Sequence, residues 1–173
     1  MVFQNPIWVT GDIKPGEFYI QFTRRFSELV QQLHSDDVIT VFINSRGGDM
    51  HTAIGVYDLL QTCRQRLTGI VAGRAESGAS LALQACDRRL VTQNSILMLH
   101  KSHIEISGSL TDGQSMIDSF RELEARFYEI YRLRSGRDFD ALQYGELRLN
   151  AHQAVELGLA DAVISSQRPS PHQ

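Results

Sequence analysis

The apolar positions of this chain follow two periods, one typical of buried strands and one typical of helices. Short apolar runs that predict strands stand at residues 7–10, 38–44, 69–72, 89–92, 95–100 and 162–164. Apolar residues at helical spacing predict helices at about 17–33, 50–64 and 110–134, and a last helix that begins near Asn150. Strands that alternate with helices predict an α/β fold with a largely parallel sheet.

The segment at about 110–134 is the longest predicted helix, and aromatic side chains lie on its apolar stripe. The stripe consists of Met116, Ile117, Phe120, Leu123, Phe127, Ile130 and Tyr131. Because one small domain does not easily cover so much apolar surface, the stripe predicts an oligomerisation arm; the alternative is an ordinary core helix. The polar segment 166–173 predicts a disordered tail, which leaves residues 1–165 as one domain.

Composition narrows the classes of protein that fit. The chain has 173 residues, 42% of them hydrophobic, and a net charge of −3 without a basic stripe, so nothing indicates a nucleic-acid partner. No apolar run approaches the ~18 residues of a membrane span, and the N-terminus lacks the pattern of a secretory signal. Cys63 and Cys86 have no metal-ligand spacing. We therefore expect a cytoplasmic protein without a metal or cofactor.

Ser77 is a candidate nucleophile. It directly follows a predicted strand and precedes a helix of small residues, and Ala75 and Ala79 lie two residues to either side. A serine on a sharp strand-to-helix turn needs small neighbours, and N–H groups at a helix N-terminus stabilise a nearby oxyanion. A serine that only caps the helix is the alternative. Ser80, one turn later, is expected to point into the helix packing.

Gly47 and Gly48 follow the strand at 38–44, where a glycine pair can expose backbone N–H groups to a ligand. Either an oxyanion hole or a phosphate site fits such a pair. Asp49 follows directly, and its carboxylate would repel a phosphate, so the oxyanion hole is favoured.

His100 ends the predicted strand at 95–100 and is the candidate general base. A core or edge histidine is the alternative. His103 faces the other way in an extended chain. A carboxylate normally accepts the Nδ1–H of such a histidine, but spacing alone does not choose among the acidic residues.

Four separated strings bring these pieces together: FINSRGGDMHTAIGVYDLLQ, GRAESGASLALQAC, NSILMLH and LNAHQAVELGLAD. In this order they resemble the Clp protease proteolytic subunits, the ClpP-type serine peptidases, over about residues 7–165. The resemblance implies the ClpP/crotonase-like fold, a spiral of ββα units. It also implies that the helix at 110–134 is the handle between stacked rings, and that residues 101–110 pair across the rings and receive the peptide.

The resemblance implies a role for each site residue. Ser77 matches the nucleophile, His100 the general base, and Glu146 the acid of the triad. The oxyanion hole matches Gly47 or Gly48, with Gly47 favoured, together with Gly78. The implied function is a serine endopeptidase that hydrolyses peptides or unfolded chains inside a homo-oligomeric ring chamber, by family analogy two stacked heptamers.

Four features depart from the family pattern. Glu146 replaces an aspartate and is one methylene longer, and Arg46 stands where proline is usual, next to the oxyanion loop. The stretch from Ser77 to His100 is about two residues shorter than in housekeeping members and is similar to shorter, phage-associated relatives. Only about six residues precede the first strand, where members that work with an ATPase have a longer segment, so a Clp ATPase partner is not expected.

Three alternatives remain at this point. A signal-peptide-peptidase-like enzyme would use a Ser–Lys dyad, but Lys14 and Lys101 are the only lysines, and Lys101 points away from His100 on an extended strand. A crotonase-type acyl-CoA enzyme would use the same oxyanion hole for an enolate, in a chain that is generally longer. A catalytically silent ring or scaffold subunit would typically have lost the serine or the histidine, and this chain keeps both.

Overall fold

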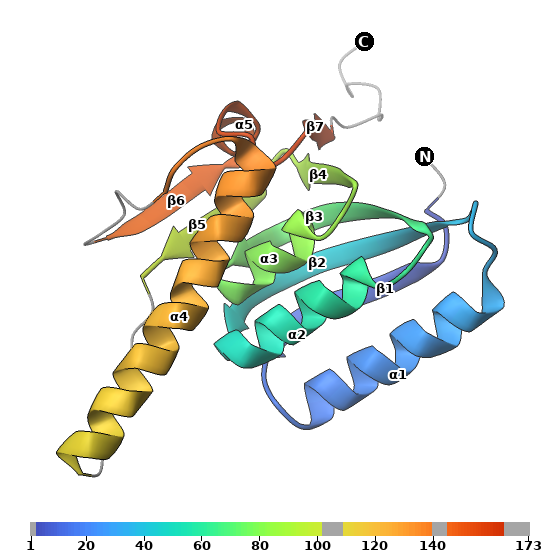
Figure 1. Ribbon diagram of the computed structural model, residues 1–173. Helices are drawn as coiled ribbons and strands as arrows, with labels where there is room; N and C mark the ends of the chain where they lie inside the picture. Colours follow the sequence, from blue (N-terminus) through green and yellow to red (C-terminus); the bar gives the residue numbers. More distant parts are fainter. Residues whose placement is uncertain (1–2, 102–108, 140–144, 165–173) are drawn as a thin grey trace.

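The computed structural model describes residues 3–101, 109–139 and 145–164, which form a seven-stranded sheet with helices packed against it (Figure 1). The strands are β1 (Pro6–Ile13), β2 (Val38–Gly48), β3 (Arg66–Glu76), β4 (Arg88–Thr92), β5 (Ile96–His100), β6 (Glu146–Asn150) and β7 (Ala162–Ile164). The helices are α1 (Glu17–Gln32), α2 (Met50–Gln61), α3 (Gly78–Gln84), α4 (Leu110–Ser135) and α5 (Ala151–Glu156). The expected α/β fold with a largely parallel sheet is confirmed.

Strand β3 is the branch point of the sheet. Five parallel strands follow the order β1-β2-β3-β4-β7, and β3 pairs with β4 through residues 68–71. Beyond that stretch, residues 74–76 of β3 pair with β5 instead, and β5 pairs antiparallel with β6. Because β2, β3 and β5 are parallel, their C-terminal ends meet at one edge, which brings Gly48, Ser77 and His100 together.

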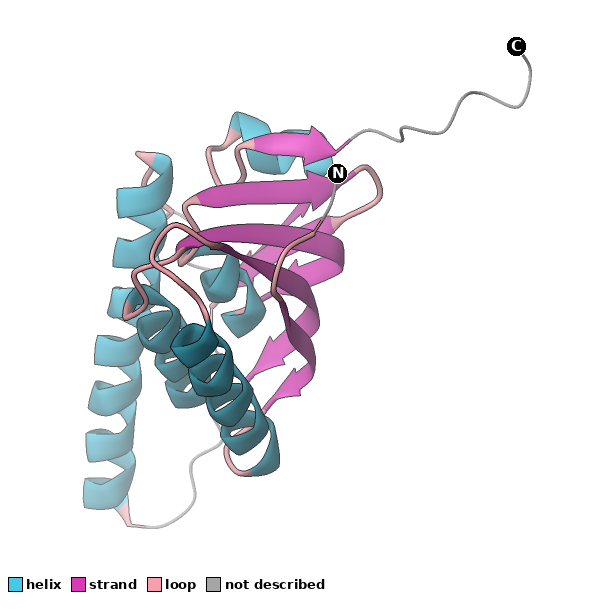
Figure 2. Cartoon of the chain, turned by 90° about the vertical axis from the view of Figure 1, so that its right-hand side faces the viewer, coloured by secondary structure: helices cyan, strands magenta, loops and turns pink. Residues whose placement is uncertain are grey.

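The larger helices cover one side of this sheet (Figure 2). Helix α1 buries Phe22, Phe26 and Leu29 beneath the strands. Helix α3 is short and entirely buried, which its glycine, alanine and serine residues allow because small side chains let the helix approach the sheet closely. This close packing fixes the turn between β3 and α3, where Ser77 stands.

Helix α4 divides into a packed half and a projecting half. Leu123, Phe127 and Tyr131, in the C-terminal half, are buried in the core. The N-terminal half extends beyond the body of the protein, and Met116 there is 44% exposed (Figure 1). The long helix predicted at 110–134 is thus confirmed, while its role as an oligomerisation arm stays a prediction.

Some boundaries differ from the sequence prediction. The strand predicted at 38–44 continues to Gly48 in β2, because Gly47 and Gly48 still pair with β1 after a register shift. Strand β3 begins at Arg66 and ends at Glu76, well beyond the apolar run at 69–72. Strand β6 carries no apolar run and is not predicted at all. The expected substrate strand at 101–110 and the tail at 166–173 lie largely or wholly outside the described residues.

Candidate active site

Ser77 occupies the sharp turn that joins β3 to α3. Its backbone has φ 51° and ψ −130°, a conformation that non-glycine residues rarely adopt and that stores strain. Its N–H donates to the carbonyl oxygen of Met98 on β5 at 2.7 Å, which fixes the turn against the neighbouring strand. The side chain makes no capping hydrogen bond to α3, so the interpretation of Ser77 as a capping serine is wrong.

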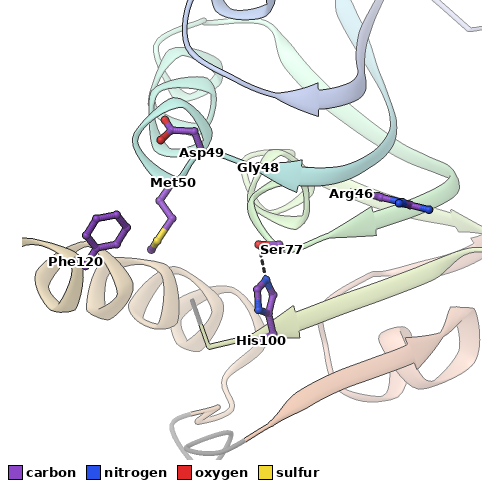
Figure 3. A pocket seen from close by; sticks show the side chains of 7 residues that line it. All are labelled: Arg46, Gly48, Asp49, Met50, Ser77, His100 and Phe120. Carbon is purple, nitrogen blue, oxygen red and sulfur yellow. Dashed lines mark hydrogen bonds between the residues drawn. The ribbon is translucent and has the colours of Figure 1, made fainter. Parts of the chain in front are cut away.

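His100 stands at the end of β5 and points at this serine (Figure 3). Its Nε2 lies 2.9 Å from the Oγ of Ser77, a hydrogen-bond distance. When the imidazole is neutral with its proton on Nδ1, Nε2 accepts the hydroxyl proton, which is the arrangement of an activated nucleophile and its base. The structure therefore brings together the two residues that the sequence placed 23 positions apart.

A cavity of about 400 Å³ opens above the pair. Its lining consists of Arg46, Gly48, Asp49, Met50, Ser77, His100 and Phe120. In Figure 3, Met50 and Phe120 lie on one side of the serine–histidine pair and Arg46 lies on the other. Asp49 is already engaged, because its carboxylate accepts from the N–H of Thr52 at 2.8 Å and from the hydroxyl of the same residue at 2.6 Å. The cavity thus has an apolar end and a cationic end.

The two glycines of β2 have different environments. The N–H of Gly47 donates to the Oγ of Ser45 at 3.0 Å, and that hydroxyl donates in turn to the carbonyl oxygen of Gly11 at 2.5 Å. Gly48, in contrast, lines the cavity. The family resemblance favours Gly47 as the oxyanion donor, but the geometry favours Gly48, because the N–H of Gly47 is engaged by Ser45 within β2 and Gly48 lines the cavity.

Gly78 opens helix α3 directly after the nucleophile. N–H groups in the first turn of a helix have no acceptor within that helix. A Cβ atom built on Gly78 would lie 2.6 Å from the Cβ of Ala53 and 3.9 Å from the nitrogen of Gly48. Gly78 and Gly48 are therefore close neighbours, and any side chain at position 78 would push α3 away from α2.

Glu146 is the first residue of β6 and pairs directly with His100 in the antiparallel ladder. Side chains of directly opposed residues share one face of the sheet and stand about 5 Å apart at their Cβ atoms. The carboxylate is about half exposed and accepts a hydrogen bond from the Nε of Arg148 at 2.9 Å. The register thus places the expected acid beside the expected base.

The competing candidates for nucleophile and base lie elsewhere. Ser80 is fully buried and bonds to the carbonyl oxygen of Ser77 and to the hydroxyl of Tyr131, as expected for a packing residue. The Nζ of Lys101 lies 3.3 Å from the Oε2 of Glu124 on α4, and Lys14 pairs with Asp12 on the surface. The contacts of the two lysines give a Ser–Lys dyad no support.

Ser45 is a site residue that the sequence reasoning missed. It is 2% exposed, and its hydroxyl connects the glycine segment of β2 to β1. A serine two residues before a glycine with positive φ is a recognisable turn signal, since the hydroxyl can accept the N–H two residues on. In this segment the sequence prediction concerns the N–H groups of the two glycines and does not include the hydroxyl of Ser45.

Neither a metal cluster nor a membrane span occurs in the part of the chain that the structure describes. Among residues 3–101, 109–139 and 145–164, no group of three or more histidine, cysteine or acidic side chains is arranged to hold a metal ion. Within the same ranges, no helix combines the length and the apolarity of a membrane span.

Comparison with known protein families agrees with this geometry. The sequence model of the Clp protease family matches residues 20–167. The matched span is most of the chain and includes the glycine pair, Ser77, His100 and Glu146. The family is one of peptidases, and its members typically assemble into rings. The chain therefore belongs to the Clp protease family.

Proposed function

We propose that this protein is a serine endopeptidase that hydrolyses peptides or unfolded chains with a triad of Ser77, His100 and Glu146. The observation that carries the proposal is the 2.9 Å contact between the Nε2 of His100 and the Oγ of Ser77. A serine on a strained turn, hydrogen-bonded to an imidazole at the edge of a cavity, is the arrangement that acyl transfer requires.

The reaction begins with the attack of Ser77 Oγ on the carbonyl carbon of the scissile peptide bond. His100 Nε2 takes the hydroxyl proton as the new C–O bond forms, and Glu146 stabilises the resulting imidazolium from the neighbouring strand. The same proton then passes to the leaving amine as the C–N bond breaks. Water, deprotonated by His100, hydrolyses the acyl-enzyme and restores the free serine.

The negative charge that develops on the carbonyl oxygen needs donors beside Ser77. The N–H groups of Gly48 and Gly78 fit this role, because both glycines flank the nucleophile and lie close to each other. Preorganised donors of this kind each contribute on the order of 10²-fold to 10³-fold in kcat.

The proposed assembly is a ring, with the projecting half of α4 as a contact between subunits or rings. Helix α4 leaves the body of the protein with Met116 exposed on its apolar stripe (Figure 1). A closed chamber would admit short peptides and loosely folded chains and exclude folded proteins. Stacked heptamers are the arrangement that the family resemblance implies.

Two measurements test this proposal. The hydrolysis rates of a short fluorogenic peptide, an unfolded protein and a folded protein are compared for the unchanged chain and for Ser77→Ala, while sedimentation gives the assembly state. We expect cleavage of the first two substrates by an oligomer, and none by Ser77→Ala. Rapid cleavage of the folded protein would contradict the chamber, and an assembled but inert unchanged chain would favour a scaffold subunit.

A further inference from the structure

A buried carboxylate stands directly before the nucleophile and has no part in the mechanism above. Glu76 ends β3 and is 5% exposed. An ionised carboxylate in such a place is costly unless a cation pairs with it. The Oε1 of Glu76 accepts a hydrogen bond from Nη1 of Arg148 on β6 at 2.8 Å, and Arg74 lies 3.9 Å from the other oxygen.

Arg148 also binds the acid of the proposed triad. Its Nε donates to the Oε1 of Glu146 at 2.9 Å while Nη1 holds Glu76. The planar guanidinium presents donors in a fixed fork, so one arginine side chain sets the positions of two carboxylates at once. These hydrogen bonds, the one to Glu146 first, raise the pKa of Arg148.

The strand register aligns this network with the catalytic pair. Met98 on β5 pairs with Glu76 on one side and with Arg148 on the other, so the ion pair between Glu76 and Arg148 crosses β5 at Met98. Two residues further along β5, His100 pairs with Glu146. Positions two apart on a strand share a face, which places Arg148 and Glu146 on the same face as His100. The network thus runs from Glu76, directly before Ser77, through Arg148 to Glu146, which pairs with His100.

We infer that Arg148 is a positioning residue: anchored on buried Glu76, it holds one carboxylate oxygen of Glu146 and turns the other toward His100. Glu146 is about half exposed, and its long side chain would otherwise sample several rotamers. A carboxylate has two oxygens and about four acceptor sites, so one oxygen can serve Arg148 while the other serves the imidazole. This role rests on the proposed function of Ser77 and His100.

The inference explains how a glutamate works where the family has an aspartate. The additional methylene gives Glu146 reach and rotational freedom, and Arg148 removes the freedom. Without Arg148, Glu146 keeps its charge but loses its orientation, so the loss should appear in kcat rather than in KM, because Arg148 is not among the residues that line the cavity.

A double-mutant cycle tests this coupling in the full-length assembled protein. The values of kcat and KM for a short peptide are measured for Arg148→Met, Glu146→Gln and the double variant. We expect Arg148→Met to lower kcat by on the order of 10-fold to 100-fold with KM unchanged, since misplacing a catalytic group by about 1 Å has effects of this size. In the Glu146→Gln background the same change should lower kcat by less than about twofold.

Matched variants distinguish a positioning role of Arg148 from a general loss of folding or assembly. Arg148→Lys should keep part of the rate, because a lysine can reach one carboxylate but not two. Arg132→Met removes a surface arginine that pairs with Glu129 on α4, and it should leave kcat unchanged. The sedimentation profile and the melting temperature of each variant report on folding. If Arg148→Met does not fold, Glu76→Gln replaces it in the cycle, with the same expected suppression by Glu146→Gln.

The inference would be overturned if Arg148→Met lowered kcat by the same factor in the unchanged chain and in Glu146→Gln. It would also be overturned if Glu146→Gln alone left kcat unchanged. In either case, an unchanged chain that still hydrolyses the peptide and loses this activity in Ser77→Ala would leave the proposed function intact. An unchanged chain that neither hydrolyses peptides nor reacts with a serine-directed probe would overturn the proposed function together with the inference.

Discussion

Gly47 packs directly against the turn that carries Ser77. A Cβ atom built on Gly47 would lie 3.0 Å from the Cβ of Ser77, 2.5 Å from the carbonyl oxygen of Glu76 and 2.8 Å from the nitrogen of Gly78. The φ of Gly47 is +87°, which side chains also disfavour. The glycine segment of β2 and the nucleophile turn therefore meet backbone to backbone, and any side chain at position 47 must separate them.

Replacing Gly47 by alanine should abolish most of the turnover. The methyl group would displace the Ser77 turn, and a shift of about 1 Å at the reacting atoms is expected to lower kcat about 100-fold. Gly136→Ala is the matched control, because Gly136 has φ +71° but no atom within 4 Å of the place that its Cβ would take. If peptide hydrolysis by Gly47→Ala stayed within about threefold of that control, the close contact between the two segments would have no catalytic importance.

Ser45→Ala should lower both kcat and stability. The change leaves the N–H of Gly47 and the carbonyl oxygen of Gly11 without their hydroxyl partner, and an unsatisfied buried polar group costs about 1–3 kcal/mol. Urea unfolding measures the loss of stability, and peptide hydrolysis measures the effect on the glycine segment. Ser35→Ala, which removes an exposed hydroxyl bonded to Asp36, is the control. Values of kcat and stability in Ser45→Ala equal to those of the unchanged chain would show that Ser45 does not position the segment.

Arg46 should influence which peptides are cleaved. Arg46 lies at the opposite end of the cavity from Met50 and Phe120 (Figure 3). A peptide that places an apolar side chain against Met50 and Phe120 would therefore place its other side near the guanidinium of Arg46. We expect kcat/KM to favour peptides with an acidic residue on that side, and Arg46→Glu to reverse the preference. The effect should shrink with added salt, because Arg46 is exposed. Peptide-library profiles that are identical for Arg46→Glu and for the surface control Arg64→Glu would refute this.

Asp161 should anchor the C-terminal strand. Its carboxylate accepts from the backbone N–H of Arg89 at 2.6 Å and from the buried guanidinium of the same residue. Burial alone would raise the pKa of Asp161, but the bonds from Arg89 outweigh it and the pKa is lowered. The side chain of Arg89 is 8% exposed but that of Asp161 is 38% exposed, so water screens part of the interaction, and Asp161→Asn should be less stable by roughly 1–2 kcal/mol at pH 7.

The lowered pKa of Asp161 determines how the destabilisation by Asp161→Asn depends on pH. A carboxyl group with a lowered pKa in the folded state contributes stability above its ordinary value of about 3.9, and the contribution is lost as the pH falls through the folded value. The difference in unfolding free energy between the unchanged chain and Asp161→Asn should therefore shrink below about pH 4. Glu129→Gln breaks an exposed pair with Arg132, and because water screens that pair, it should show a much smaller difference of the same sign. A constant difference at all pH values would contradict the assignment.

The sequence predicted the α/β fold and the central pair of the site for identifiable reasons. The strand at 95–100 has a continuous apolar run, so its last residue, His100, could be placed at a strand end from the sequence alone. Ser77 stood between a strand and a helix of small residues, which limited the local geometry to a sharp turn. Resemblance to a family then selected these two residues from several serines and histidines.

The sequence did not reveal the features that depend on long-range register. Strand β6 is short and alternates polar with apolar residues, so it has no apolar run to detect, and among the described residues it pairs with β5 alone. The network of Glu76, Arg148 and Glu146 exists only because β3, β5 and β6 align at Met98 and His100. The preference for Gly48 over Gly47 likewise depends on the hydroxyl of Ser45, which binds the N–H of Gly47 and is itself held by the carbonyl oxygen of Gly11 on another strand.

The most direct test of the account is the intact mass of the protein after treatment with a fluorophosphonate, which reacts only with an activated serine. The unchanged chain is compared with Ser77→Ala, His100→Ala and the surface control His152→Ala, each checked for assembly. The account predicts one adduct on the unchanged chain and on the control, and none on Ser77→Ala or His100→Ala. No adduct on a well-assembled unchanged chain, or an adduct that persists in His100→Ala, would contradict the activation of Ser77 by His100.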